Sequence, residues 1–177
     1  MITNSRSDNV NTRNLVVDIL LAVTRDGAFS HIAIRDVLDK YRYLPKQDRA
    51  FITRLSQGTI ERMIELDAII NQFSKTKVKK MKPVIAAILR SGVYQLKYMD
   101  SVPDSAACNE AVKLTVKRGF GGLKGFVNGV MRTIARNMDQ IRYPDAEKRT
   151  GAVSVCQIFY TGMAGAAFYR AVRGRSL

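Results

Sequence analysis

A dense run of lysines is the feature of this chain that points most directly to a chemical partner. Residues 75–82 include no acidic residue and contain five lysines, namely Lys75, Lys77, Lys79, Lys80 and Lys82. Ammonium groups on an exposed segment bind phosphates and release the counterions that surround a nucleic acid. The alternative is a solvated loop that only keeps the protein in solution. Because the run ends at Pro83, we interpret it as a linker between two helices.

Further basic residues form a second tier of candidate phosphate contacts. They flank a glycine-rich turn or lie near the beginning of the chain, and comprise Arg13, Lys117, Arg118, Lys124 and Arg132. The formal net charge of +14 has the same sign, and so strong a charge favours a nucleic acid over other partners. The sequence leaves open whether the two tiers share a face.

The glycine-rich turn itself matches neither phosphate-loop pattern. It reads Gly119-Phe120-Gly121-Gly122-Leu123-Lys124-Gly125. G-x-x-x-x-G-K-[ST] needs a lysine followed by serine or threonine, and G-x-G-x-x-G needs glycine where Lys124 stands. We interpret Gly119 as a helix cap, followed by a turn whose amides open the next helix and can meet a phosphate.

The titratable side chains form no recognisable catalytic or metal-binding pattern. His31 is the only histidine, and Cys108 and Cys156 lie too far apart for a metal motif. We therefore predict no catalytic residue, no metal site and no cofactor, with both cysteines as free thiols in a reducing cytoplasm. The helical carboxylates are expected to form ion pairs with nearby Arg and Lys; they are Asp36, Asp39, Glu61, Glu65 and Asp67.

These residues must be positioned by helices, because apolar side chains recur at helical spacing up to about residue 140. The first stripe runs from Leu15 to Val23. Ser30 is expected to cap a second helix, and Pro45 to open a long helix, or two helices joined near Gly58. Two further helices are expected to begin at Pro83 and at Pro103. The pattern predicts an all-α bundle of six to seven helices, in two halves meeting near residues 74–82.

The organisation we expect is a flexible N-terminus over residues 1–12, a helical domain over 13–140, and a linker remnant with an atypical basic tail over 141–177. One uncharged run, residues 150–169, has roughly the length of a membrane-spanning helix. It contains no leucine but three glycines and a glutamine, a composition that disfavours insertion. We therefore predict a soluble, cytoplasmic protein without a membrane segment.

Several segments, in order, resemble the NusB-like RNA-binding domain. They are Phe29-Ser30-His31-Ile32-Ala33, Asp48-Arg49-Ala50-Phe51-Ile52-Thr53, Gly58-Thr59-Ile60, the stretch from Ile88 to Leu96, Asn109-Glu110-Ala111-Val112 and Phe126-Val127-Asn128. The resemblance covers residues 13–140 and implies an all-α fold of two small helical subdomains that binds RNA. The second segment is closer to the domain fused to RsmB-type ribosomal-RNA cytosine methyltransferases than to the free-standing antitermination factors.

That resemblance implies ribosomal RNA as the partner. The methyltransferase family carries an S-adenosylmethionine-dependent catalytic domain after the helical one, and no such domain is recognisable here, so we expect no catalysis from this chain. The alternative is a NusB-like antitermination factor acting with RNA and a ribosomal protein.

The sequence after residue 148 departs from the family. From Lys148 to Leu177 it contains no acidic residue and shows no sensible period. Our hypothesis is a reading-frame change near residues 147–150, and the alternative is a natural, weakly folded basic tail.

Overall fold

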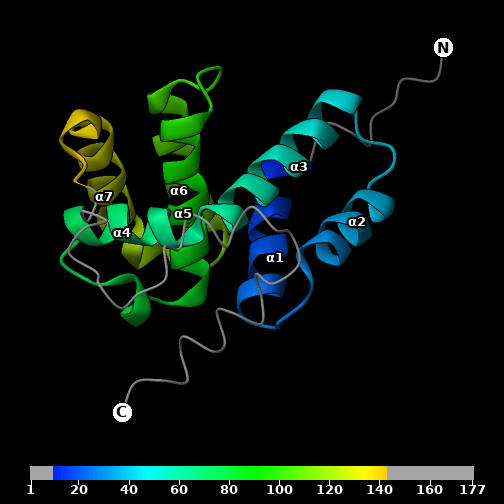
Figure 1. The fold of residues 1–177 in the computed structure, drawn as a ribbon, viewed down its shortest axis with the longest axis horizontal. Helices are drawn as coiled ribbons and strands as arrows, with labels where there is room; N and C mark the ends of the chain where they lie inside the picture. Colours follow the sequence, from blue (N-terminus) through cyan, green and yellow to red (C-terminus); the bar gives the residue numbers. More distant parts are fainter. Residues whose placement is uncertain (1–9, 143–177) are drawn as a thin grey trace, which may run out of the picture.

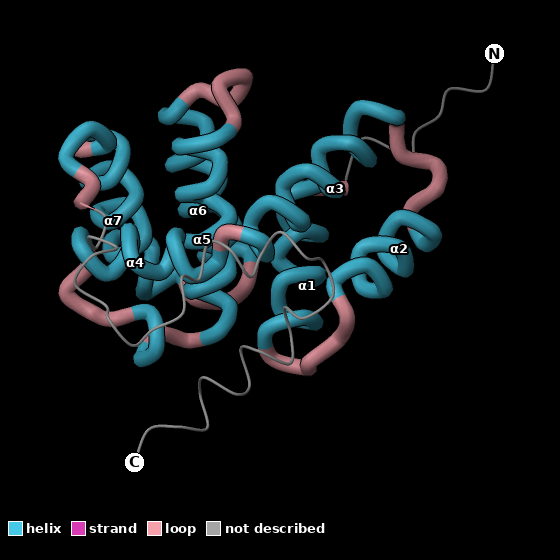
Figure 2. Tube along the Cα trace, in the orientation of Figure 1, coloured by secondary structure: helices cyan, strands magenta, loops and turns pink. Residues whose placement is uncertain are grey.

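The computed structural model describes residues 10–142, in which loops connect helices and no strand is present (Figures 1 and 2). The predicted all-α fold is therefore confirmed. The helices are α1 (Thr12–Thr24), α2 (Ser30–Lys40), α3 (Lys46–Glu61), α4 (Met63–Phe73), α5 (Pro83–Tyr98), α6 (Asp104–Lys117) and α7 (Lys124–Arg136), with short 3-10 turns η1 (Val78–Lys80), η2 (Gly121–Leu123) and η3 (Met138–Gln140).

The helices form two halves that share α5. Helices α1, α2 and α3 pack together on the right of Figure 1, and α4, α6 and α7 lie on the left. Helix α5 contacts α1 and α3 as well as α4, α6 and α7, and its residues from Ile85 to Gln95 are all buried. The chain passes from the first half to the second at Arg62, between α3 and α4, and not near residues 74–82 as the sequence suggested.

Gly58 does not mark the break between these two helices. It lies inside α3, where a Cβ atom would come within 2.1 Å of the Tyr94 hydroxyl oxygen. The glycine therefore lets α3 approach α5 closely, and the chain changes direction at Arg62. Predicting a break from helix propensity fails here because close packing, and not a turn, requires the glycine.

The predicted helix starts are correct to within one residue. Pro83 is the first residue of α5, as predicted. Helix α2 begins at Ser30 and its N-cap is Phe29, which has no capping side chain; Pro45 is the N-cap of α3 and not its first residue. Both predictions are displaced by one position, the usual uncertainty of helix ends.

Helices α5, α6 and α7 run alternately up and down because short connections join them. Residues 99–103 connect α5 to α6 at the top of Figure 1, and residues 118–123 connect α6 to α7 at the opposite end. Helix α5 also begins at this opposite end, so the segment before it lies at the same end of the bundle as the glycine-rich turn.

Among residues 10–142, no helix combines the length and the apolar composition that crossing a membrane requires. The stretch 150–169 and the proposed frame change lie outside the described residues.

Candidate nucleic-acid interface

The run of lysines, residues 75–82, forms a loop with a fixed backbone, which we call the lysine loop. Val78 is only 4% exposed and inserts into the core. Its backbone N–H donates to Asn71 Oδ1 at 2.8 Å, and the Ser74 hydroxyl donates to the Thr76 carbonyl at 2.8 Å. One buried apolar side chain and these side-chain hydrogen bonds therefore hold the loop between α4 and α5.

The lysine side chains of this loop all face solvent. Each of the five is exposed, namely Lys75, Lys77, Lys79, Lys80 and Lys82. Lys77 Nζ donates to the Asn71 carbonyl at 3.0 Å. Among residues 10–142 none of the five pairs with a carboxylate, so the loop presents positive charge that the described part of the protein does not neutralise.

The glycine-rich turn carries two more exposed lysines, Lys117 and Lys124. Gly119 adopts a left-handed conformation with φ of 81°, which confirms it as the glycine that ends α6. At Gly121 and at Gly125, by contrast, an added Cβ would meet nothing within 4 Å. Packing therefore does not require glycine at these two positions. Without a side chain there, the backbone at Gly121, before α7, and at Gly125, in the first turn of α7, is accessible to a ligand.

The alternating direction of α5, α6 and α7 brings the lysine loop and the glycine-rich turn to the same end of the second half (Figure 2). We refer to the two segments together as the basic end. Arg132 is exposed but lies two turns further along α7 than Lys124, a rise of about 12 Å for eight residues. Its Nε donates to Asn128 Oδ1 at 3.0 Å. Arg132 thus lies outside the basic end.

Arg13 is partly buried between α1 and its neighbours. Its Nε donates to Gln95 Oε1 at 2.7 Å, and its guanidinium lies over the Phe51 ring, 5.0 Å from the centroid. Burial lowers the pKa of Arg13, and the nearby Glu110 carboxylate opposes that shift. The side chain therefore connects three helices, and its predicted contact to RNA stays a prediction.

Arg118 joins the end of α6 to α1. Its Nε donates to Asn14 Oδ1 at 2.8 Å, and its Nη2 donates to the Asn14 carbonyl at 2.8 Å. The same Nη2 forms an ion pair with Asp18 at 2.7 Å. The guanidinium of Arg118 is therefore bonded within the protein, unlike the ammonium group of its neighbour Lys117.

A cluster centred on Glu65 joins α4 to the end of α5. Glu65 Oε1 accepts from the Tyr98 hydroxyl at 2.7 Å and from Lys97 Nζ, and Oε2 accepts from Arg62 at 3.2 Å. The Arg62 guanidinium also lies 4.4 Å from the centroid of the Tyr98 ring. Burial would raise the pKa of Glu65, but the hydrogen bonds from Lys97 and Tyr98 hold it below its usual value.

Within residues 10–142, four of the five carboxylates predicted to form ion pairs do so, and Glu61 is the exception. Asp36 pairs with Arg35, Asp39 with Arg42 and Asp67 with Arg90. Glu61 instead accepts from Gln57 at 2.9 Å. The sequence provided no signal for the contact between α4 and α5 because Glu65 and Lys97 are far apart along the chain.

Within residues 10–142, neither His31 nor Cys108 has a neighbour that would activate it for catalysis. His31 is exposed in the first turn of α2. Cys108 is buried, and burial together with the Asp104 carboxylate raises the pKa of its thiol, which makes the thiolate nucleophile scarce at neutral pH. Over the same residues no group of three or more His, Cys, Asp or Glu side chains could hold a metal ion.

The fold and the site define a class of protein: a helical domain in two halves, the second of which carries a basic end. A model of the NusB family matches residues 10–136, and the chain belongs to that family. The probable ribosomal RNA small subunit methyltransferase B of Bacillus subtilis (strain 168) is 36% identical over 124 residues, 70% of this chain and 27% of the relative. A second relative of that name, from Synechocystis, is 36% identical with 29% of its length covered, so the chain spans under a third of these relatives.

Antitermination proteins of the same family are also similar. The transcription antitermination protein NusB of Agathobacter rectalis is 39% identical over 90 residues, which cover 50% of this chain and 69% of that protein. A crystal structure of antitermination factors NusB and NusE in complex with dsRNA matches 77% of this chain and 98% of its own chain. The TM-score is 0.65 at 20% identity, which supports the fold.

Proposed function

We propose that this chain binds RNA through the basic end. The observation that carries the proposal is the lysine loop, which holds five exposed lysines without a carboxylate partner among residues 10–142 on an anchored backbone. Two further exposed lysines, Lys117 and Lys124, lie at the same end. Lysine contacts to phosphates give affinity without sequence selection, so the basic end accounts for binding and not for which sequence is bound.

We further propose ribosomal RNA as the partner, bound in the cytoplasm without catalysis by this chain. The support is the similarity to methyltransferases whose name includes ribosomal RNA, of which the chain spans 27% and 29%. In this proposal the helical domain holds the RNA while chemistry belongs to a separate protein unit. We predict that the chain with S-adenosylmethionine transfers no methyl group to ribosomal RNA; observed transfer would contradict this part of the proposal.

A salt series tests the role of the lysine loop. Binding of the full chain to a short single-stranded RNA of ribosomal sequence is measured by fluorescence anisotropy from low to moderate salt. The five loop lysines should contribute about −3.5 to the log–log slope, or about 0.7 for each contact. Replacing the five loop lysines with glutamine should reduce the magnitude of the slope to that left by the remaining contacts. An unchanged slope would show that the lysine loop does not contact phosphate.

A matched pair of variants separates local contact from total charge. Lys79→Gln with Lys80→Gln removes two charges from the lysine loop, and Lys40→Gln with Lys46→Gln removes two exposed charges from the first half. The loop pair should reduce the magnitude of the slope by about 1.4, whereas the second pair should leave it within experimental error. Equal effects from both pairs would mean that only net charge matters.

The second candidate function is antitermination together with a protein partner. It is favoured by the 39% identity to the Agathobacter rectalis NusB protein and by the likeness to NusB bound to NusE and dsRNA. This function predicts that adding the NusE protein raises RNA affinity and sequence selectivity together. If NusE has no effect on RNA affinity, RNA binding by the chain alone remains the better description.

A further inference from the structure

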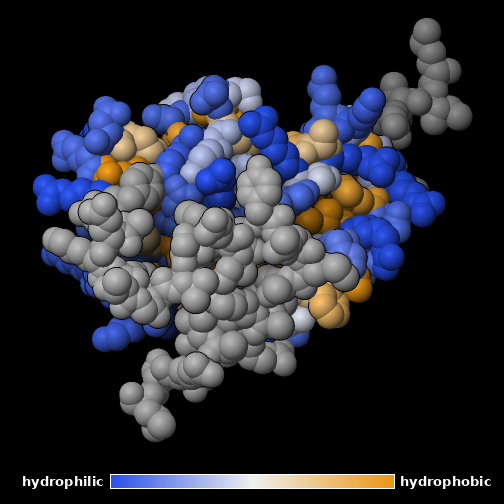
Figure 3. Space-filling view, viewed as in Figure 1, coloured by the Kyte–Doolittle hydropathy of each residue, from blue (hydrophilic) through white to orange (hydrophobic). Residues whose placement is uncertain are grey.

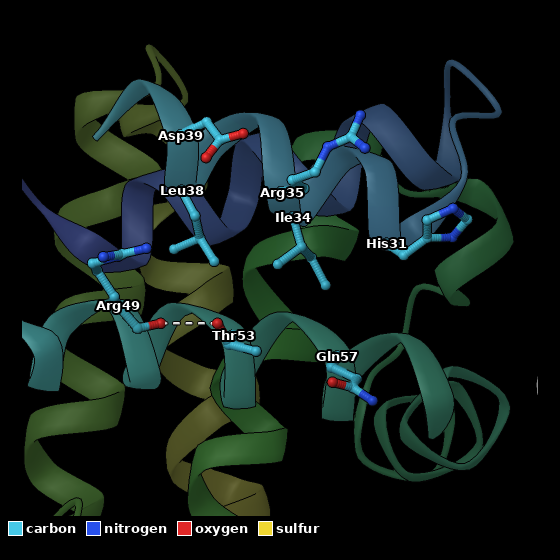
Figure 4. Close-up of a pocket in the computed structure, with 8 residues that line it drawn as sticks. All are labelled: His31, Ile34, Arg35, Leu38, Asp39, Arg49, Thr53 and Gln57. Atoms are coloured by element: carbon cyan, nitrogen blue, oxygen red, sulfur yellow. Dashed lines mark hydrogen bonds between the residues drawn. The ribbon is translucent and has the colours of Figure 1, made fainter. Parts of the chain in front are cut away.

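A groove runs between α2 and α3, on the half of the molecule that does not carry the basic end. It has a volume of about 330 Å³, and Ile34 and Leu38 of α2 form its apolar floor. Figure 4 shows these two side chains pointing toward α3, which lines the groove with Arg49, Thr53 and Gln57. In Figure 3 an apolar patch bordered by hydrophilic side chains lies over the same region.

Arg49 is the uncompensated charge of this groove. Its Nε is buried and has no hydrogen-bond acceptor among the described residues, and no carboxylate of that part of the chain forms an ion pair with it. The neighbouring arginines differ, because Arg35 pairs with Asp36 and Arg42 with Asp39. Because Arg49 as a whole is only partly buried and no described carboxylate neutralises it, a ligand that brings a carboxylate would form an ion pair with its guanidinium.

The surroundings of the groove favour a protein segment over a nucleic acid. Arg35 of the groove pairs with Asp36, and Asp39 of the groove pairs with Arg42. Among residues 10–142 the groove therefore offers one arginine without a carboxylate partner, Arg49, whereas a nucleic acid presents a run of phosphates that needs several cations. Phe29, which is 62% exposed, lies beside His31 at one end of the groove with the two rings 5.9 Å apart. An apolar floor with an exposed aromatic ring beside it is typical of a surface that binds apolar side chains.

We propose that the groove between α2 and α3 binds an acidic amphipathic helix of a partner protein. Apolar side chains of that helix pack on Ile34 and Leu38, and one of its carboxylates accepts hydrogen bonds from Arg49. Charge complementarity favours an acidic helix as the occupant, because its carboxylates would pair with Arg49 and its apolar side chains would cover Ile34 and Leu38. The chain's own residues 148–177 do not fit, since they contain no acidic side chain.

A designed peptide tests this proposal on the full chain. The probe is a capped, fluorescein-labelled peptide of about 14 residues, four helical turns, with leucines on one face and glutamates elsewhere. The control peptide has glutamine in place of each glutamate. The acidic peptide should bind about tenfold more tightly than the control, because its carboxylates pair with a guanidinium.

Two variants locate the binding site. Arg49→Met keeps an apolar stem and removes the charge, and Gln57→Glu places a negative charge on an exposed position that lines the groove. Each should weaken binding of the acidic peptide about tenfold, since both remove charge complementarity. Both should leave the RNA salt slope unchanged, so this result is independent of the proposed RNA-binding function.

Amide chemical-shift mapping separates specific docking from general attraction to a basic protein. Shifts confined to α2 and α3, and retained in the Lys79→Gln with Lys80→Gln variant, support the proposal. It is overturned if the shifts fall on the basic end, if Arg49→Met binds the peptide as well as the unaltered chain does, or if no binding occurs. Self-association that depends on Arg49 would overturn it too, because the occupant would then be a second copy.

Discussion

The lysine loop and the contacts of α1 with α5 and α6 both contain cationic side chains, yet these side chains play different roles. Arg13 of α1 donates to Gln95 of α5, and Arg118, which follows α6, is bonded to Asn14 and Asp18 of α1. In the lysine loop the five ammonium groups face solvent without a carboxylate partner among the described residues. One region uses its cations to join helices, and the other leaves them available to a ligand.

The acceptors near a cation, and not the density of cations, therefore indicate its role. The acceptors of Arg13 and Arg118 lie on other helices, more than eighty positions away along the chain. The arginine guanidinium also has a fork of five donors suited to fixed pairing, whereas the lysine ammonium is a flexible point charge. The comparison therefore predicts separate effects on stability and on RNA binding.

The largest effect on stability is expected at a cation that lies fully inside the fold. Arg90, only 5% exposed, pairs with Asp67 through two hydrogen bonds of 2.6 and 2.7 Å. Arg90→Met leaves the Asp67 carboxylate without this partner and should lower the free energy of unfolding by about 3 kcal/mol. Urea unfolding measures the loss. A loss under 1 kcal/mol would show that water replaces the pair.

A smaller but sharper contrast is expected between two adjacent residues. Arg118→Gln should reduce the free energy of unfolding by about 1.5 kcal/mol, because it breaks hydrogen bonds to α1. Lys117→Gln should change it by less than about 0.5 kcal/mol. For RNA binding the order reverses, with Lys117→Gln reducing the magnitude of the salt slope by about 0.7. If Arg118→Gln flattened the slope instead, the division between the two regions would be wrong.

The smallest effect is a pH dependence from Glu65. Because its pKa is lower in the folded protein than the ordinary value of 4.5, the unfolded state binds more protons as pH falls. The stabilisation is present above the ordinary pKa and is lost as pH falls through the lowered one. Unfolding measured between about pH 6 and pH 3 should show this loss. Glu65→Gln should remove its share of the pH dependence, and Tyr98→Phe, which removes one of the donors, should reduce it in part.

Most of the fold was predictable because apolar spacing reports helices well. The stripe from Leu15 to Val23 and the start of α5 at Pro83 both agree with the structure. The break between α3 and α4 was not predictable from Gly58, because that glycine allows Tyr94 to approach and the break falls at Arg62. Helix propensity contains no information about which distant side chain will occupy the space above a glycine.

The candidate site was predictable only in part for a related reason. The exposed lysines of the loop follow from local sequence, because a run without acids before Pro83 has no local partner. The bonded state of Arg118 depends on Asn14 and Asp18. That Arg49 has no carboxylate partner among residues 10–142 depends on the packing of α2 against α3. Contacts between helices decide these cases, and a single sequence does not encode them in any local pattern.

The burial of Val78 beneath the lysine loop has a consequence for the thermodynamics of binding. A flexible loop would lose backbone entropy when it became ordered on a ligand, at about 1 kcal/mol or more for each residue. With Val78 in the core and its N–H bonded to Asn71, folding has already removed much of that freedom. Binding of a nucleic acid therefore costs little further backbone entropy in this loop. Only the lysine side chains adjust to the spacing of successive phosphates.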